Sequence, residues 1–84
     1  MTDEIVQHAD HVARSGASFD DSDTLRELIL TAPHAATAAY ARAVRLAADA
    51  FTDGERRRWA GVGRAIAAVA AAAEVAIDSP DPPR

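Results

Sequence analysis

The chain has 84 residues, no cysteine and a formal net charge of −4. The absence of cysteine excludes disulfide bridges, thiolate metal sites and cysteine nucleophiles. A chain of this length forms one domain and buries only about 60–65% of the surface that its unfolded form exposes. Self-association or a partner protein is therefore the expected source of additional stability.

The charged residues are unevenly distributed along the chain. Residues 1–27 contain seven acids and two arginines, for a net charge of −5, whereas residues 28–64 have a net charge of +3. The acidic first part could therefore lie against the basic middle of its own chain or of a neighbouring one. All nine basic residues are arginine, and 22 positions are alanine, which is typical of a high-GC bacterial genome. The overall negative charge disfavours nonspecific binding to nucleic acid or to anionic membranes.

The composition indicates a cytoplasmic protein with no contact to a membrane. The first residues, Met1 to Glu4, are acidic where a secretory signal is basic. The longest weakly polar run, over residues 65–73, is far shorter than the roughly 20 residues of a membrane span.

The first half of the chain predicts two helices and the beginning of a third. Apolar residues recur at helical spacing over residues 2–15, and Gly16 suits the left-handed position after a helix. A short second helix is expected from near Ser22, and Pro33 ends it because proline disfavours helix in the residue before it. Pro33 also suits the first position of a third helix, which we predict to extend to about Phe51.

A capping motif marks the start of a fourth helix. In the run from Thr52 to Glu55, the threonine can bond to the third amide of the helix while the glutamate reaches back. We predict that this helix continues to about Asp78. Residues 1–78 would then form a single helical domain, and the proline-rich residues 79–84 a disordered tail.

The last two predicted helices carry matching apolar seams, which is the strongest signal in the sequence. In the fourth helix the spacing alternates between three and four, as in a coiled coil; its members are Trp59, Val62, Ile66, Val69, Ala73 and Ala76. The third helix offers Pro33, Ala36, Tyr40, Ala43 or Val44, Ala47 and Phe51. We therefore predict an all-α fold, a small bundle of about four helices built on a long alanine-rich antiparallel helical hairpin.

The fourth helix also predicts a homodimer. Over residues 65–77 its only polar residue is Glu74, and a helix that is apolar on nearly all sides should be buried on nearly all sides. The first two helices can cover one flank of the hairpin, which leaves the other flank for a second copy. The alternative is that the exposed alanines simply tolerate solvent.

Two small groups of residues are candidates for binding a ligand. Glu4, His8 and His11 share one helical face, and a carboxylate with two imidazoles is a ligand set for zinc. The competing interpretation is a solvated polar face, and we predict no cofactor. Tyr40 and Trp59 belong to the seams, yet their polar tips could line a small pocket near the turn, beside Arg58 or Arg42.

An arginine-rich surface near the predicted turn is the candidate site for a partner. Its members are Arg56, Arg57, Arg58, Arg64, Arg42 and Arg45. Such a surface suits an acidic protein. Binding of nucleic acid is the alternative, but the flanking helices are longer than those of a helix-turn-helix motif and the net charge is negative.

The sequence contains no pattern that indicates catalysis. It has neither a catalytic cluster of serine, histidine and acid nor a glycine-rich phosphate loop. The leading hypothesis is a non-catalytic, homodimeric interaction module that serves a larger protein as adaptor, regulator or accessory factor. The alternatives are a small helical enzyme or a ligand- or metal-binding protein, and a nucleic-acid-binding regulator.

Overall fold

The computed structural model describes residues 2–15 and 19–77, and every regular element in these ranges is a helix. In chain order the helices are α1 (Thr2–Ser15), α2 (Phe19–Thr31), α3 (Pro33–Asp49) and α4 (Asp53–Ala72). The predicted all-α class and the bundle of four helices are therefore confirmed. None of the described helices is both long and apolar enough to cross a membrane.

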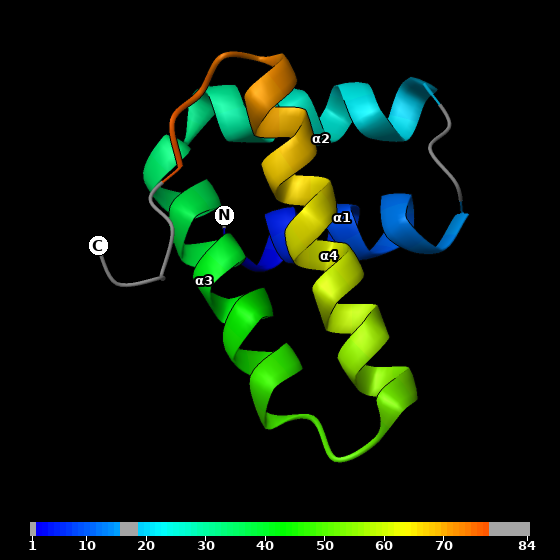
Figure 1. Cartoon of the computed structure of the whole chain (residues 1–84). Helices are drawn as coiled ribbons and strands as arrows, with labels where there is room; N and C mark the ends of the chain where they lie inside the picture. The colour runs from blue at the N-terminus through cyan, green and yellow to red at the C-terminus, as the bar shows by residue number, and fades with distance from the viewer. Residues whose placement is uncertain (1, 16–18, 78–84) are drawn as a thin grey trace.

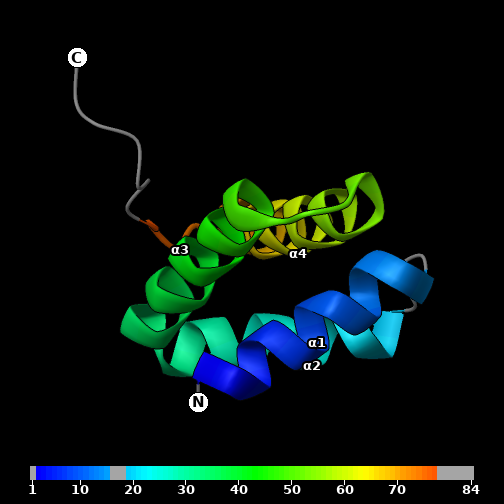
Figure 2. The same cartoon turned by 90° about the horizontal axis from the view of Figure 1, so that it is seen from below.

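The helices are arranged in two layers. In the first layer α3 and α4 lie side by side, run in opposite directions and make the most extensive contact of any helix pair (Figure 1). The second layer contains α1 and α2, and α1 packs against both α3 and α4. Seen from below, α1 and α2 lie on the same side of the hairpin, so no described helix covers its opposite side (Figure 2).

The core lies between the layers and is formed by side chains at helical spacing on all four helices. Helix α3 contributes only alanines to it, whereas the branched side chains come from α1, α2 and α4. Small side chains on α3 allow its neighbours to pack close to its backbone. The buried apolar residues are Ile5, Ala9, Val12, Leu25, Ile29, Ala36, Ala39, Ala43, Val62, Ile66 and Ala70.

The predicted seam of the fourth helix is buried only over its first part. Val62 and Ile66 are fully buried and Trp59 is half-buried, in agreement with the predicted inward face. Ala73 and Ala76 lie beyond the last residue of α4, and Ala76 is exposed. The seam is therefore shorter than its spacing indicated.

The turn between α3 and α4 begins earlier than predicted. Helix α3 ends at Asp49, and Ala50 has an extended backbone with φ −65° and ψ 137°. Phe51 therefore lies outside the helix, and its side chain is 99% exposed instead of buried on the inner seam. Thr52 caps α4 as predicted, because its hydroxyl accepts a 3.1 Å hydrogen bond from the amide of Glu55.

Two other helix boundaries also differ from the predictions. Helix α2 begins at Phe19 instead of near Ser22, since acids in a first turn are favoured by the helix dipole. Helix α4 ends at Ala72 and does not continue to Asp78, because the chain turns back across the end of the bundle (Figure 1). The predictions for Gly16 and for the end of the domain and its tail lie outside the described residues.

The end of α4 is a Schellman motif, the arrangement in which two amides bond back to carbonyls of the last helical turn. The amide of Val75 donates to the carbonyl of Ala70 at 2.8 Å, and that of Glu74 donates to Ala71 at 3.1 Å. Glu74 takes the left-handed position, with φ 60°. The turn allows Val75 and Ile77 to pack against the core.

Glycine in place of Glu74 should stabilise the protein. A Cβ in the left-handed region costs about 1–2 kcal/mol, which glycine avoids, although the greater freedom of glycine in the unfolded chain offsets part of the gain. We expect Glu74→Gly to raise the free energy of unfolding by about 0.5–1 kcal/mol in urea titrations followed by circular dichroism. Glu74→Ala is the matched control, because it removes the carboxylate but keeps the Cβ. Equal stability of the two variants would contradict the strain at this position.

Candidate functional site

Two of the six arginines in the predicted recognition surface turn toward α1. Arg58 of α4 pairs with Asp10, and Arg42 of α3 donates a hydrogen bond to Asp3. Both acids belong to the negatively charged first part of the chain, which therefore lies against the basic middle of the same chain. These two arginines therefore add polar contacts between the layers, which are joined mainly by the apolar core.

The other four arginines of the predicted surface remain exposed. Arg56 lies 3.6 Å from Asp53 in the first turn of α4. Arg45, Arg57 and Arg64 form no ion pair with any residue in the described ranges 2–15 and 19–77. Arg57 and Arg64 are seven residues apart on α4, so they lie two turns apart on one helical face.

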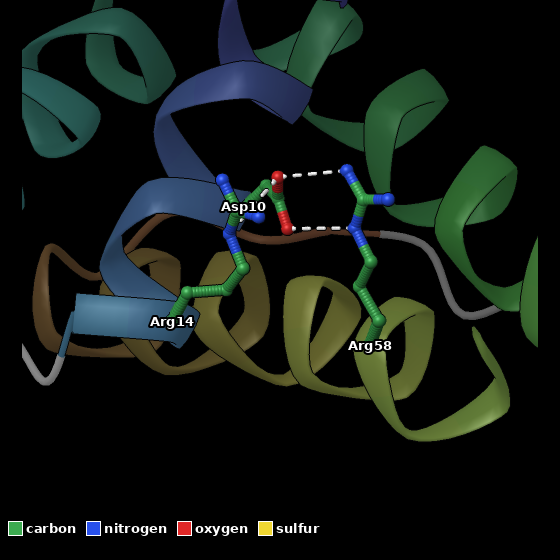
Figure 3. Close-up of polar contacts among 3 residues, drawn as sticks. All are labelled: Asp10, Arg14 and Arg58. Atoms are coloured by element: carbon green, nitrogen blue, oxygen red, sulfur yellow. Dashed lines mark hydrogen bonds and ion pairs between the residues drawn. The ribbon is translucent and has the colours of Figure 1, made fainter. Parts of the chain in front are cut away.

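Asp10 is the only buried polar residue in the described part of the chain, with 9% of its surface exposed. Its Oδ1 accepts a hydrogen bond of 3.1 Å from Nε of Arg58, and its Oδ2 accepts one of 3.0 Å from Nη2 (Figure 3). Nε of Arg14, one turn further along α1, lies 3.6 Å from the same Oδ2. Such a two-pronged contact fixes both the distance and the orientation of the two groups.

The contact with Arg58 also controls the ionisation of Asp10. The hydrogen bonds from Arg58 lower the pKa of Asp10 below its ordinary value of 3.8. Burial acts in the opposite direction, and electrostatic interactions with Arg58, Arg14 and His11 lower this pKa further. The same hydrogen bonds raise the pKa of Arg58. The pair is therefore fully charged in the folded protein at neutral pH.

An apolar groove of about 420 Å³ lies between α3 and α4, and no residue of α1 or α2 lines it. We call it the α3–α4 groove. Its α3 wall is formed by Tyr40, Val44 and Ala47, and its α4 wall by Trp59, Ala60, Gly63, Arg64 and Ala67.

Tyr40 and Trp59, the two residues proposed from the sequence for a small pocket, lie on opposite walls of the α3–α4 groove. The arginine that lines the groove with them is Arg64, where the sequence indicated Arg58 or Arg42, because those two are held by α1. The guanidinium carbon of Arg58 lies 4.9 Å from the centre of the Trp59 ring, within cation–π distance. The ion pair with Asp10 therefore also supports one wall of the groove.

Phe51 is a candidate functional residue that the sequence interpretation missed. It continues the apolar spacing of the third helix, and the spacing alone placed it in the core. The cap at Thr52 does not correct this placement, because it determines where the fourth helix begins and not where the third helix ends. In the structure Phe51 lies in the turn that joins the two walls of the α3–α4 groove.

Glu4, His8 and His11, the predicted metal ligands, are not brought together as a metal site. Glu4 and His11 are exposed and His8 is half-buried. Within residues 2–15 and 19–77, no group of three or more histidine or acidic side chains is arranged to hold a metal ion. His11 instead lies close enough to Asp10 to help lower the pKa of that carboxyl group.

Comparison of the chain with models of protein families, with curated proteins and with solved structures finds no match. Its function must therefore be inferred from its own surface. The features available for that inference are the α3–α4 groove, the exposed side chain of Phe51, and Arg57 and Arg64, which form no ion pair within residues 2–15 and 19–77.

The pair of Asp10 and Arg58 predicts a loss of stability in acid. Because the folded pKa of Asp10 lies below the unfolded value, the pair stabilises the protein above pH 3.8 and loses this effect as the pH falls through the folded pKa. We expect Asp10→Asn to lower the free energy of unfolding by about 1 kcal/mol at neutral pH. The difference from the unmodified protein should decline as the pH falls below 3.8 and disappear once the pH lies below the folded pKa of Asp10.

Urea titrations over a series of pH values measure this effect. Glu27→Gln is the matched control, because it replaces an exposed acid of α2 by its amide. The prediction fails if Asp10→Asn lowers the free energy of unfolding by the same amount at every pH. It also fails if Glu27→Gln lowers the free energy of unfolding in the same way.

Proposed function

We propose that this chain is a non-catalytic interaction module that binds a helical segment of a larger protein in the α3–α4 groove. The observation that carries the proposal is Phe51, an aromatic side chain that is 99% exposed in the turn joining the two walls. Burial of a phenylalanine side chain is favourable by about 1.5–3 kcal/mol. A partner that covers Phe51 would therefore gain this free energy on binding.

The shape and chemistry of the groove support the same proposal. Two antiparallel helices form its walls, and apart from Arg64 and the hydroxyl of Tyr40 the lining side chains are apolar or small. An apolar groove between helices is a common binding site for the apolar face of a third helix. Trp59 and Tyr40 belong to the residue types that dominate the binding energy of protein interfaces.

The two alternative hypotheses receive less support. Binding of nucleic acid depends on many unpaired cations facing phosphates, whereas Arg58, Arg42 and Arg56 already lie against acids of their own chain. The alternative of a small helical enzyme or metal-binding protein uses Glu4, His8 and His11. Within residues 2–15 and 19–77, no group of three histidine or acidic side chains is arranged to hold a metal ion. A role as adaptor, regulator or accessory factor requires only the binding surface.

Photo-crosslinking from position 51 tests the proposed function. With a benzophenone amino acid in place of Phe51, we expect one protein of the source organism to be captured, identified by mass spectrometry and then purified. The purified protein should bind the unmodified chain, and Phe51→Ser should weaken binding about tenfold or more, as expected for the loss of an aromatic contact at the end of the groove. The thermal stability should stay unchanged, because Phe51 is exposed.

Leu30 provides the matched control for the crosslinking. It is the other large apolar side chain exposed in the described residues, at 46%, and it belongs to α2 in the opposite layer. Capture that is equally strong from positions 30 and 51 indicates nonspecific contact. A purified partner that binds Phe51→Ser as tightly as the unmodified chain would also refute the proposal.

A further inference from the structure

One cation lines the α3–α4 groove, and a second cation lies on the same face of α4. Arg64 is the only charged residue among those that line the groove, and it is exposed. Arg57 lies on the same face of α4, two turns earlier. Neither arginine forms an ion pair within residues 2–15 and 19–77. The apolar surface is therefore accompanied by two positive charges that the described part of the chain does not balance.

The length of the groove suits one short helix. The α3 wall extends from Tyr40 to Ala47, and the α4 wall from Trp59 to Ala67. At 1.5 Å per residue, these walls are about 11–12 Å long. An amphipathic helix with apolar anchors at positions i, i+3 or i+4, and i+7 presents them over about 10.5 Å. Three anchors of one helix therefore match the groove.

We infer that the occupant of the α3–α4 groove is an acidic amphipathic helix of a partner protein, with acids two turns apart that meet Arg57 and Arg64. This inference rests on the proposed function and names the kind of partner. The apolar anchors supply most of the binding energy by contact with Tyr40, Val44 and Trp59. The acids select the partner and accelerate its association, as complementary charges at the edge of an interface do.

A second copy of this chain fits the same surface less well. In a symmetric groove-to-groove contact that places α4 of one copy over α4 of the other, Arg57 and Arg64 of each copy approach those of the other. Like charges brought together in this way oppose association. The exposed acids Asp23 and Glu27 lie on α2, in the other layer. Contacts between these acids and the arginines of a second copy would join copies head to tail and would not close a dimer.

Three synthetic peptides test the charge of the occupant. Each has about 18 residues and the same leucines at i, i+3, i+4 and i+7, and its polar face is filled with glutamate, glutamine or lysine. Trp59 is the only tryptophan in the chain, so its fluorescence reports binding to the groove. We expect the glutamate peptide to bind about tenfold or more tightly than the lysine peptide. The difference should narrow at about 1 M salt, where charges are screened beyond about 3 Å.

Variants of the full-length chain identify the arginines responsible. The double variant Arg57→Gln/Arg64→Gln should bind the glutamate peptide about threefold to thirtyfold more weakly, while its affinity for the glutamine peptide stays the same. Arg26→Gln is the control, because it removes an exposed arginine of α2 that has no ion pair in the described residues. Circular dichroism establishes that each variant is folded.

The outcomes separate this inference from the proposed function. Equal affinity for all three peptides refutes selection of an acidic helix, while loss of binding in Phe51→Ser would still support a site in the groove. If no peptide binds but the protein captured from position 51 binds, the proposed function is supported. The inference that the groove binds an acidic helix is then wrong. Sedimentation that shows a dimer, with Trp59 shielded from an added quencher, would identify a second copy as the occupant and overturn the inference.

Discussion

The bidentate contact between Asp10 and Arg58 determines how the two layers fit together. Rotation of α4 about its axis would break both hydrogen bonds to a carboxylate that is otherwise buried, which makes such a rotation costly. With Arg58 held against α1, the 3.6-residue repeat places Arg57 and Arg64 on another side of α4. The guanidinium of Arg58 also lies against the Trp59 ring, so one ion pair orients both the charges and the apolar wall of the α3–α4 groove.

The abundance of alanine explains why the groove is open. Among the residues whose burial the structure describes, the largest completely buried side chains are Ile5, Leu25, Ile29, Ile66 and Val62, and none of them comes from α3. Alanines on α3 bring the neighbouring helices close, but each contributes little to stability. Burial of one methylene group is favourable by only about 0.8 kcal/mol, and an alanine side chain has a single carbon. The chain therefore uses its large side chains to attach α1 and α2 to one side of the hairpin. Tyr40, Val44 and Trp59 are only half-buried, and they line the groove, to which α1 and α2 contribute no residue.

Features encoded over a few residues were predictable from the sequence, and features that depend on distant contacts were not. The helices and the cap at Thr52 follow from apolar spacing, from Pro33 and from a hydroxyl next to free amides. The end of α4 was missed because Glu74, a residue with no preference for the left-handed region, takes that position when the segment after it packs on the core. The residues of the groove were partly predictable, since Tyr40 and Trp59 were identified. Which arginines pair with acids of α1 and which stay exposed was not predictable, because Asp10 and Arg58 are 48 positions apart in the sequence.

The charge of the groove arises from the way the fold pairs its other charges. The acidic first part of the chain places Asp3 and Asp10 against Arg42 and Arg58, so two cations of the basic middle are neutralised on the inner side of the hairpin. The positive charge of Arg57 and Arg64 then remains on the outer side. A chain with a net charge of −4 thereby keeps a cationic edge beside its exposed apolar surface. Asp3 and Asp10 pair with Arg42 and Arg58, and they do not reach Arg57 and Arg64. The contacts between α1 and the hairpin therefore also determine where positive charge remains for an acidic partner.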